Sequence, residues 1–367
     1  MGMIYISAAI LAFLLSCFLT GVVKRLALRY GYVAMPRKRD VHSKPVPRIG
    51  GIAFVVAFMI VSAVSFLVVR PEWTFDTVNW FGIDRKLLAI WVGGSIVAFT
   101  MLLDDLRQMS AWKKLMFQVM AATVVIASGI SIDILSNPFG QAFSLREVSI
   151  PIFTLAGNTY HISLWSDLLT LIWLVGMMNI INFVDGVDGL ASGVSMIAAT
   201  TIFILSLSVS VNQPATALLS IILSGVAAGF LVWNFPPAKI FMGDSGSMFL
   251  GLMLGVLAII SGGKLATAFL VLAFPITDGI LVAVGRLVRR ENPFTTPDKT
   301  HLHHRFLNAG FTVRQSILIL YLISITSGAL ALHFKTVNKI ITAFFLVILL
   351  LVLIKVLNIM ATKRGVQ

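Results

Sequence analysis

Residues 165–190 read WSDLLTLIWLVGMMNIINFVDGVDGL. An apolar run near 165–182 is long enough to cross the hydrocarbon core of a bilayer, and it leads directly into a short acidic segment. In that segment, Asp-Gly-Val-Asp-Gly places permissive backbone beside each carboxylate, which allows tight turns and the close approach of a ligand. The stretch therefore predicts a membrane helix that ends in a charged, ligand-accessible loop.

The rest of the chain has the composition of a membrane protein. Apolar residues make up 58% and charged residues 12% of the 367 positions, and the mean hydropathy is +0.96. A soluble fold cannot bury that much apolar surface. We expect an all-α polytopic membrane protein, a single integral membrane domain over residues 1–367. Its apolar windows, about eleven in number, lie near 3–22, 49–69, 87–103, 113–130, 165–182, 189–209, 215–233, 245–261, 265–288, 314–333 and 338–358.

The distribution of positive charge predicts an orientation. With eleven spans the termini lie on opposite sides, and the odd-numbered loops with the C-terminal tail carry 21 of the 28 Lys and Arg residues. We therefore expect those loops and the C-terminus in the cytoplasm and the N-terminus outside. The first run, Met1–Val23, lacks a basic n-region and a small-x-small cleavage site, which indicates a retained helix.

Two further features concern the surroundings of the bundle. The net charge of +13 lies mostly in loops beside spans, which indicates contact with anionic lipid and argues against nucleic acid as a partner. The outer connection near 131–164 contains Val148–Ile152 and Tyr160–Leu164 on either side of Ala156-Gly157-Asn158. This pattern predicts a small external β-hairpin with an architectural role.

Acidic residues are few and gather where spans end. The third span ends in Asp104 and Asp105, the fifth leads into Asp185 and Asp188, and the seventh is followed by Asp244. All three clusters fall on the predicted cytoplasmic side. Such clusters can build a site for Mg²⁺, for which Mn²⁺ is a substitute, because hard cations prefer carboxylate and amide oxygens. The start of the eighth span at Asp244 also predicts free backbone N–H groups for phosphate oxygens.

Two basic loops offer the opposite charge. The first loop carries His42 and Arg48, and Lys239 precedes the third acidic cluster. The ninth loop carries three histidines and an arginine within five positions: His301, His303, His304 and Arg305. The histidines leave a zinc site open as an alternative, but the pattern favours recognition of an anionic substrate.

These motifs resemble, in order and over nearly the whole chain, those of the polyprenyl-phosphate N-acetylhexosamine-1-phosphate transferases. The motifs are Val-His-Ser-Lys-Pro-Val-Pro-Arg-Ile-Gly-Gly at 41–51, Asp104-Asp105, Asn-x-x-Asn-x-x-Asp-Gly-x-Asp-Gly at 179–189, Phe-Met-Gly-Asp-Ser-Gly at 241–246 and His-Leu-His-His-Arg at 301–305. The resemblance is greatest to the bacterial branch that uses UDP-N-acetylglucosamine (UDP-GlcNAc) and undecaprenyl phosphate. The peptidoglycan translocase branch is the alternative.

The resemblance implies a role for each candidate. Asp244 and Asn182 correspond to metal ligands, and Asp104 and Asp105 to the carboxylates that handle the lipid phosphate. Where the translocase branch has Asp-Asp-x-x-Lys, this chain has Gln108, so Lys113 or Lys114 would supply the charge. Residues expected near the nucleotide or sugar are Asn179, Asp185, Asp188, His301, His303, His304 and Arg305.

The implied reaction moves a sugar-1-phosphate onto a lipid phosphate at the cytoplasmic face of the bacterial plasma membrane. The second pKa of the acceptor phosphate lies near 6, so direct attack needs no strong base, although a covalent phospho-aspartate is an open alternative. A cation-coupled transporter is the rival from another class. Asp278, within the ninth span, would be a positioning partner or a packing acid. The sequence leaves a homodimer open.

Overall fold

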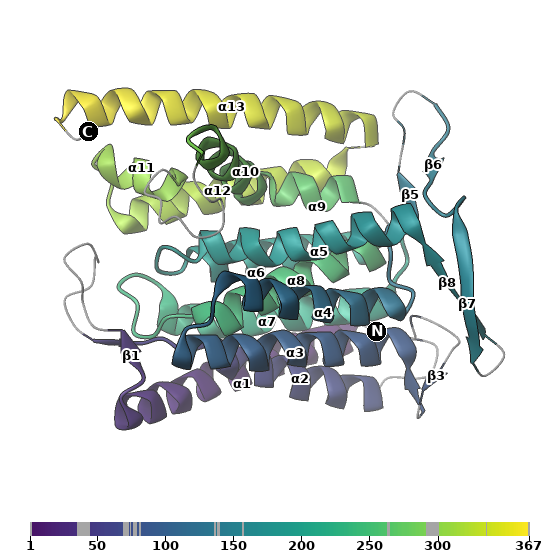
Figure 1. Cartoon of the computed structure of the whole chain (residues 1–367). Coiled ribbons are helices and arrows are strands. Elements are labelled where there is room, and N and C mark those ends of the chain that lie inside the picture. The colour runs from purple at the N-terminus through teal and green to yellow at the C-terminus, as the bar shows by residue number, and fades with distance from the viewer. Residues whose placement is uncertain are drawn as a thin grey trace.

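The computed structural model is a bundle of helices that run roughly parallel to one another (Figure 1). It describes residues 2–34, 45–68, 73, 75, 79–80, 82–135, 137, 140–155, 158–262, 265–290, 301–334 and 336–365. His42 and most of the ninth loop lie outside these residues, so the expectations for them stay predictions. The helices are α1 (Gly2–Tyr30), α2 (Gly51–Val68), α3 (Arg85–Arg107), α4 (Ala111–Ala127), α5 (Leu164–Val184), α6 (Leu190–Leu207), α7 (Pro214–Asn234), α8 (Gly243–Ile260), α9 (Leu265–Val271), α10 (Ala273–Val288), α11 (Leu302–Asn308), α12 (Val313–His333) and α13 (Thr336–Lys363).

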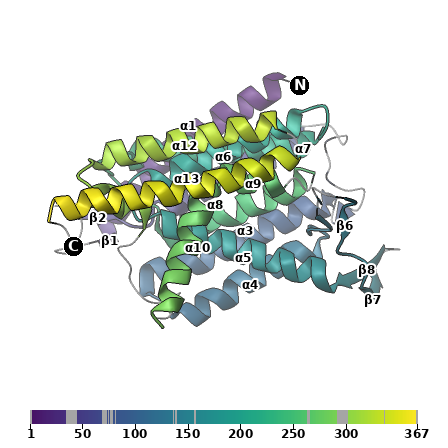
Figure 2. The ribbon, with the colours of Figure 1, turned by 90° about the horizontal axis from the view of Figure 1, so that it is seen from above.

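The predicted fold class is confirmed. Within the described residues nine helices are long and apolar enough to cross a membrane, and the bent pair α9–α10 makes ten. Helix α4, with 17 residues, falls just short of that length. The termini lie at opposite ends of the bundle (Figures 1 and 2), which agrees with an odd number of crossings. The count of eleven and the orientation remain predictions.

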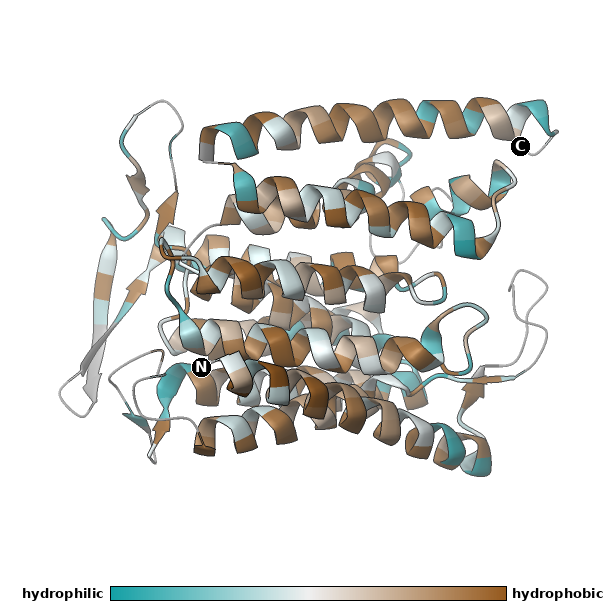
Figure 3. Ribbon diagram, turned by 180° about the vertical axis from the view of Figure 1, so that it is seen from behind, coloured by the Kyte–Doolittle hydropathy of each residue, from teal (hydrophilic) through white to brown (hydrophobic). Residues whose placement is uncertain are grey.

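The side chains match a bilayer environment. Apolar residues cover the helices along most of their length, and hydrophilic residues gather toward the helix ends and the loops (Figure 3). Helix α13 is the most lipid-like, with a mean hydropathy of 3.1 and only 11% of its window buried. A helix that is apolar and yet exposed requires hydrocarbon as its solvent.

The predicted span 265–288 is broken in two. Helices α9 and α10 meet at an angle of 78°, with Leu272 between them. Pro275 stands in the first turn of α10, where a proline is tolerated because its missing N–H would have no partner. Its ring excludes the carbonyl of the residue four positions earlier, Val271, where α9 ends. The proline therefore accounts for the bend, which falls just before it.

Helix α8 forms the centre of the bundle and carries the third acidic motif at its start. Its residues from Ser245 to Ile259 are all buried, as expected of a helix that is apolar all round. A Cβ atom on Gly51 would lie 2.4 Å from Gly246, so only glycine allows α2 and α8 to begin in contact. The glycines thus fix the first turn of α8 against the end of the first loop.

Short strands lie beyond the helix ends. The predicted hairpin is present as β7 (Ser149–Leu155) and β8 (Asn158–Ser163), paired antiparallel with a bulge after Pro151. The sequence did not predict three further two-residue pairs, which are too short for a period-two pattern. They are β1 (Val33–Ala34) with β2 (Val46–Pro47), β3 (Asn79–Trp80) with β4 (Ile83–Asp84), and β5 (Ile134–Leu135) with β6 (Phe143–Ser144).

Candidate active site

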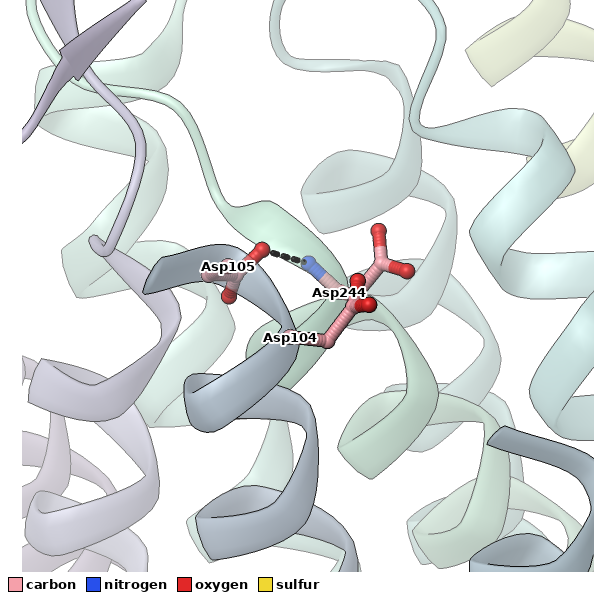
Figure 4. Close-up of side chains that lie close together, drawn as sticks. All are labelled: Asp104, Asp105 and Asp244. Atoms are coloured by element: carbon pink, nitrogen blue, oxygen red, sulfur yellow. Dashed lines mark hydrogen bonds between the residues drawn. The ribbon is translucent and has the colours of Figure 1, made fainter. Parts of the chain in front are cut away.

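Two of the three acidic motifs meet at one end of the bundle. Asp104 and Asp105 lie in the last turn of α3, and Asp244 lies in the first turn of α8 (Figure 4). One carboxylate oxygen from each lies within 4.8 Å of the others. We call these three residues the carboxylate cluster. It comes together because α3 and α8 pack side by side.

Asp105 holds the start of α8 in place. Its Oδ1 accepts a hydrogen bond from the backbone N–H of Asp244 at 2.9 Å, and its Oδ2 accepts one from Ser245 at 3.1 Å. A helix start leaves such N–H groups unpaired, and a carboxylate also suits its positive dipole end. The sequence led us to expect these donors to be free for phosphate. In the structure, Asp105 occupies them.

Gly243 makes this contact possible. Its φ of +75° lies in the left-handed region, and a Cβ atom there would lie 2.3 Å from the carbonyl oxygen of Arg48 and 2.6 Å from the Asp105 carboxylate. Any other residue would be strained and would push α3 away from α8. The geometry therefore requires glycine at position 243, directly before Asp244.

Lys114, in the first turn of α4, lies on the carboxylate cluster. Its Nζ is 2.6 Å from Oδ2 of Asp104 and 2.7 Å from Oδ2 of Asp244. Asp104 itself is buried, and its Oδ1 accepts the N–H of Met109 at 2.5 Å, which closes the turn between α3 and α4. Lys113 is exposed. Of the two candidate lysines, only Lys114 contacts the acids.

The two asparagines of α5 differ in their surroundings. The Oδ1 of Asn182 accepts the Ser247 hydroxyl at 2.7 Å, which places this side chain against the first turn of α8. Asn179 exchanges hydrogen bonds with the buried Gln118 of α4, donating from Nδ2 at 2.9 Å. Asn182 therefore lies next to the motif of Asp244, and Asn179 ties α5 to α4.

The loop between α5 and α6 carries the second acidic motif. Burial raises the pKa of Asp185 well above its usual value, and the charges of Asp244, Asp105 and Asp188 raise it further. Asp185 is therefore close enough to Asp105 and Asp244 for their negative charges to act on it. Asp188 also contacts the segment after α7, because its Oδ2 accepts the backbone N–H of Ala238 at 2.9 Å.

A buried side chain that the sequence did not reveal joins this loop to the motif of Asp244. Asn234, at the end of α7, accepts the N–H of Gly189 at 2.9 Å and donates to the carbonyl of Ile240 at 3.0 Å. The hydroxyl of Tyr321 in α12 donates to the carbonyl of Gly189. A polar residue at the buried end of an apolar helix is the sequence signal that could have identified Asn234.

The histidine motif begins α11 and reaches the same loop. Asp278 fixes it, because its Oδ2 lies 2.9 Å from Nδ1 of His301 and its Oδ1 accepts the N–H of Leu302 at 2.7 Å. This is the positioning role that the sequence left open. A Cβ atom on Gly186 would lie 3.0 Å from Nε2 of His303, so the imidazole packs directly on the acidic loop.

His303 is a buried, neutral imidazole. It is 1% exposed, and neither ring nitrogen has a hydrogen-bond partner among the described residues. Burial lowers the pKa of His303 well below its usual value, and the neighbouring His304 and His301 lower it further. A buried polar group without a partner is costly, so a ring in this state suits contact with a bound ligand.

The other sequence candidates make different contacts. Arg305 donates to Asn358 of α13 at 2.7 Å, and the Lys239 ammonium lies 5.7 Å from the Trp233 ring centre. Arg48 lines a small pocket together with Asp105. Arg286 of α10, which the sequence did not single out, is buried 5.8 Å from the Phe183 ring centre.

Comparison with known proteins places this arrangement in a family. The model of glycosyl transferase family 4 matches residues 87–262, which include the second and third acidic motifs and the Asp104-Asp105 pair. The chain is 32% identical to the probable undecaprenyl-phosphate N-acetylglucosaminyl 1-phosphate transferase of Bacillus subtilis, over 94% of this chain and 88% of that protein. The chain belongs to glycosyl transferase family 4.

Two further relatives are also named as polyprenyl-phosphate N-acetylglucosamine-phosphate transferases. The decaprenyl-phosphate N-acetylglucosaminephosphotransferase of Mycolicibacterium smegmatis is 34% identical over 88% of this chain and 79% of its own length. The undecaprenyl-phosphate alpha-N-acetylglucosaminyl 1-phosphate transferase of Thermotoga maritima is 30% identical over 80% and 79%. The resemblance found in the sequence is thus confirmed: this chain is a multi-pass membrane enzyme of the polyprenyl-phosphate sugar-phosphate transferases.

Proposed function

We propose that the enzyme transfers GlcNAc-1-phosphate from UDP-GlcNAc to undecaprenyl phosphate, releasing UMP and forming undecaprenyl-diphospho-GlcNAc. The names of the three relatives support GlcNAc-phosphate as the transferred group and a polyprenyl phosphate as the acceptor. The structural observation that carries the proposal is the carboxylate cluster with Lys114, placed at the end of membrane helices where a lipid phosphate and a soluble nucleotide can meet. The product would begin a teichoic acid, O-antigen or related envelope glycan.

The donor set of this site fits a hard divalent cation, and we propose Mg²⁺. Three carboxylates and the amide of Asn182 offer only oxygen ligands, which is the chemistry that magnesium prefers. The Lys114 ammonium, bound to two of the carboxylates, shows that the cluster attracts positive charge. Asp244 and Asn182, with the aspartates of α3 beside them, would hold the ion. When bound, it would neutralise charge on the diphosphate and the leaving UMP.

In the proposed reaction an oxygen of the lipid phosphate attacks the β-phosphorus of the nucleotide sugar. The new bond is a P–O bond to the lipid. The bond that breaks joins the β-phosphorus to the bridging oxygen, which leaves with its electron pair on UMP. Since the acceptor is largely dianionic at pH 7, no side chain must remove a proton. Lys114 brings a positive charge to the diphosphate, and Asp105 keeps α3 and α8 in register.

The loop of Asp185 and the histidine motif would bind the nucleotide sugar. His303 packs on Gly186, and His301 is held by Asp278, so the two loops already form one wall beside the carboxylate cluster. The neutral His303 ring can donate one hydrogen bond and accept another without carrying a charge. That property suits a sugar hydroxyl or a uracil edge.

A covalent route through an aspartate makes a different prediction. It would release one UMP per enzyme from UDP-GlcNAc alone and add a GlcNAc-phosphate to the protein. Direct attack releases UMP only when undecaprenyl phosphate is also present. Rapid mixing without acceptor, followed by intact-protein mass spectrometry, distinguishes the two. We propose direct attack, with the site at the cytoplasmic face of the bacterial plasma membrane; a homodimer remains compatible with it.

The test of the function uses purified enzyme, Mg²⁺ and undecaprenyl phosphate with three donors in separate reactions: UDP-GlcNAc, UDP-GalNAc and UDP-MurNAc-pentapeptide. We expect UMP release and a diphosphate-linked lipid from UDP-GlcNAc. Preferential use of the pentapeptide donor would move the enzyme to the peptidoglycan translocase branch and leave the reaction class intact. No lipid product from any donor would refute the proposed function.

A further inference from the structure

The β7–β8 hairpin leaves the bundle at the start of α5, at the end opposite to the carboxylate cluster. It runs across the ends of the helices instead of along them (Figure 1), and it projects past α5 when seen from above (Figure 2). In a membrane protein this direction is close to the plane of the bilayer. The hairpin therefore lies where an element either faces water or rests on lipid.

The base of the hairpin is amphipathic. Ile150 pairs with Ile162. Val148 and Leu164 stand two positions away, just outside the strands, and the N–H of Leu164 donates to the carbonyl of Val148 at 3.3 Å, so this pair continues the ladder on the same side. All four are large apolar side chains and all are exposed, Ile150 by 61% and Ile162 by 47%. We call these four residues the apolar face. The opposite face has Ser149 paired with Ser163, and Pro151 paired with His161.

The apolar face continues directly into helix α5. Trp165, Leu168 and Ile172 are 56%, 44% and 60% exposed, and their spacing places them on one side of that helix. On a membrane helix such a stripe faces acyl chains. A tryptophan at the junction suits the headgroup level, where aromatic side chains are enriched. The exposed apolar surface thus passes from helix to hairpin without interruption.

Hydrogen bonds fix the hairpin in this orientation. Asp167, in the first turn of α5, accepts the backbone N–H of Ser163 at 2.9 Å. Asp133, in the segment before β5, accepts a hydrogen bond from the hydroxyl of Ser166 in α5 at 2.9 Å and pairs with Arg146 Nε at 2.8 Å. The segment before β7 and the end of β8 are thus both linked to the first turn of α5, which fixes the base of the hairpin relative to that helix.

We propose that the apolar face of the hairpin is a lipid-binding surface that rests in the bilayer interface. Its occupant is the acyl-chain and headgroup boundary, because the face is continuous with the lipid-facing side of α5 and is fixed to it. An exposed apolar patch at this position would otherwise face water. This inference rests on the membrane fold and is independent of the donor and acceptor proposed above. It gives the external hairpin a function as a lateral anchor.

Spin labels on the two faces test the inference. In a full-length Cys17→Ser background, single cysteines replace Ile150 or Ile162 on the apolar face, and Ser149 or His161 on the opposite face serve as matched controls. All four positions are exposed, so a label displaces no packed side chain. The protein is placed in phosphatidylcholine–phosphatidylglycerol liposomes. For each label we take the ratio of its collision frequency with oxygen to its collision frequency with a nickel chelate. We expect this ratio to be at least several-fold higher for the apolar-face labels than for the controls.

Two results would overturn the inference. Equal collision ratios at Ile150 and His161 would show that the hairpin stands in water. Labels at Ile150 that are shielded from both reagents and show dipolar coupling between copies would show a second copy of this chain on the face. A label pattern repeated at Val148 and Leu164 would extend the lipid contact to the junction with α5.

Discussion

Replacing Asp105 by asparagine separates two roles that its position in the structure allows. The carboxylate accepts the N–H groups of Asp244 and Ser245 at 2.9 and 3.1 Å, and it also belongs to the carboxylate cluster. A hydrogen bond to a charged acceptor contributes about 1.5–3 kcal/mol. An amide retains one acceptor oxygen and turns an NH₂ group toward the other N–H. We therefore expect a loss of about 2–4 kcal/mol of stability, in addition to a loss of turnover.

The matched control is Asp244→Asn. The Asp244 side chain binds Lys114, is 19% exposed, and accepts no backbone N–H of α8 within the described residues. This variant should lose most activity, because a carboxylate of the proposed cation site becomes neutral, while its fold remains stable. The two variants should therefore resemble each other in turnover and differ in stability.

Both variants are compared with the parent in the same detergent, by tryptophan fluorescence during heating and by UMP release at saturating substrates. The expected result is a lower thermal midpoint for Asp105→Asn than for Asp244→Asn, with both inactive or nearly so. An Asp105→Asn protein with the parent's midpoint and no activity would refute the capping argument. It would assign Asp105 to the substrate alone.

Four further changes test other parts of the site and the topology. Lys114→Met should lower turnover roughly 100-fold, as removal of a charge-stabilising donor does, while the exposed Lys113→Met stays within about twofold; equal losses would contradict the assignment. Asn234→Asp retains the acceptor for Gly189 but places an oxygen against the Ile240 carbonyl, so it should lower the free energy of unfolding by about 1–3 kcal/mol, seen as a lower thermal midpoint, and raise the magnesium concentration needed for half-maximal turnover. Burial lowers the pKa of His303, so the unfolded chain binds a proton near pH 6.5 that the fold rejects; stability should fall as the pH drops from 7 to 5, and His303→Phe should flatten that fall. In a Cys17→Ser background, cysteines at Ser110 and Thr362 should react with an impermeant reagent only from the cytoplasmic side and one at Ser149 only from outside; the reverse would overturn the orientation.

The meeting of Asp104, Asp105 and Asp244 could be predicted from the sequence, because all three stand at the ends of spans assigned to one side of the membrane. The break between α9 and α10 could also be predicted from the sequence, since Pro275 excludes the helical carbonyl of Val271. Both predictions use local rules and the alternation of a chain that crosses a bilayer. Neither identifies which helices are neighbours, and the packing of α3 beside α8 is known only from the structure.

What could not be predicted depends on the rotation of each helix and on contacts between distant segments. Lys113 and Lys114 are adjacent, yet a helix turns by about 100° per residue, so only one of them can face the acids. Arg305 belongs to the motif of His303 but contacts Asn358, 53 positions later. The bonds from Asp105 to α8 span about 140 residues, and no sequence pattern reports them.

The charge of the site connects its architecture with its proposed chemistry. Three aspartates at the ends of two packed helices repel one another, and the pairing of Asp105 with the start of α8 forces them to stay close. Lys114 compensates for one of the three negative charges. The remaining formal charge equals that of one divalent cation in magnitude. A cluster with this remaining charge can bind one divalent cation, which a bound diphosphate would then share. The same contact that fixes α3 to α8 thus holds together the charges that the proposed cation would balance, so we expect changes to Asp105 to alter stability and metal dependence together.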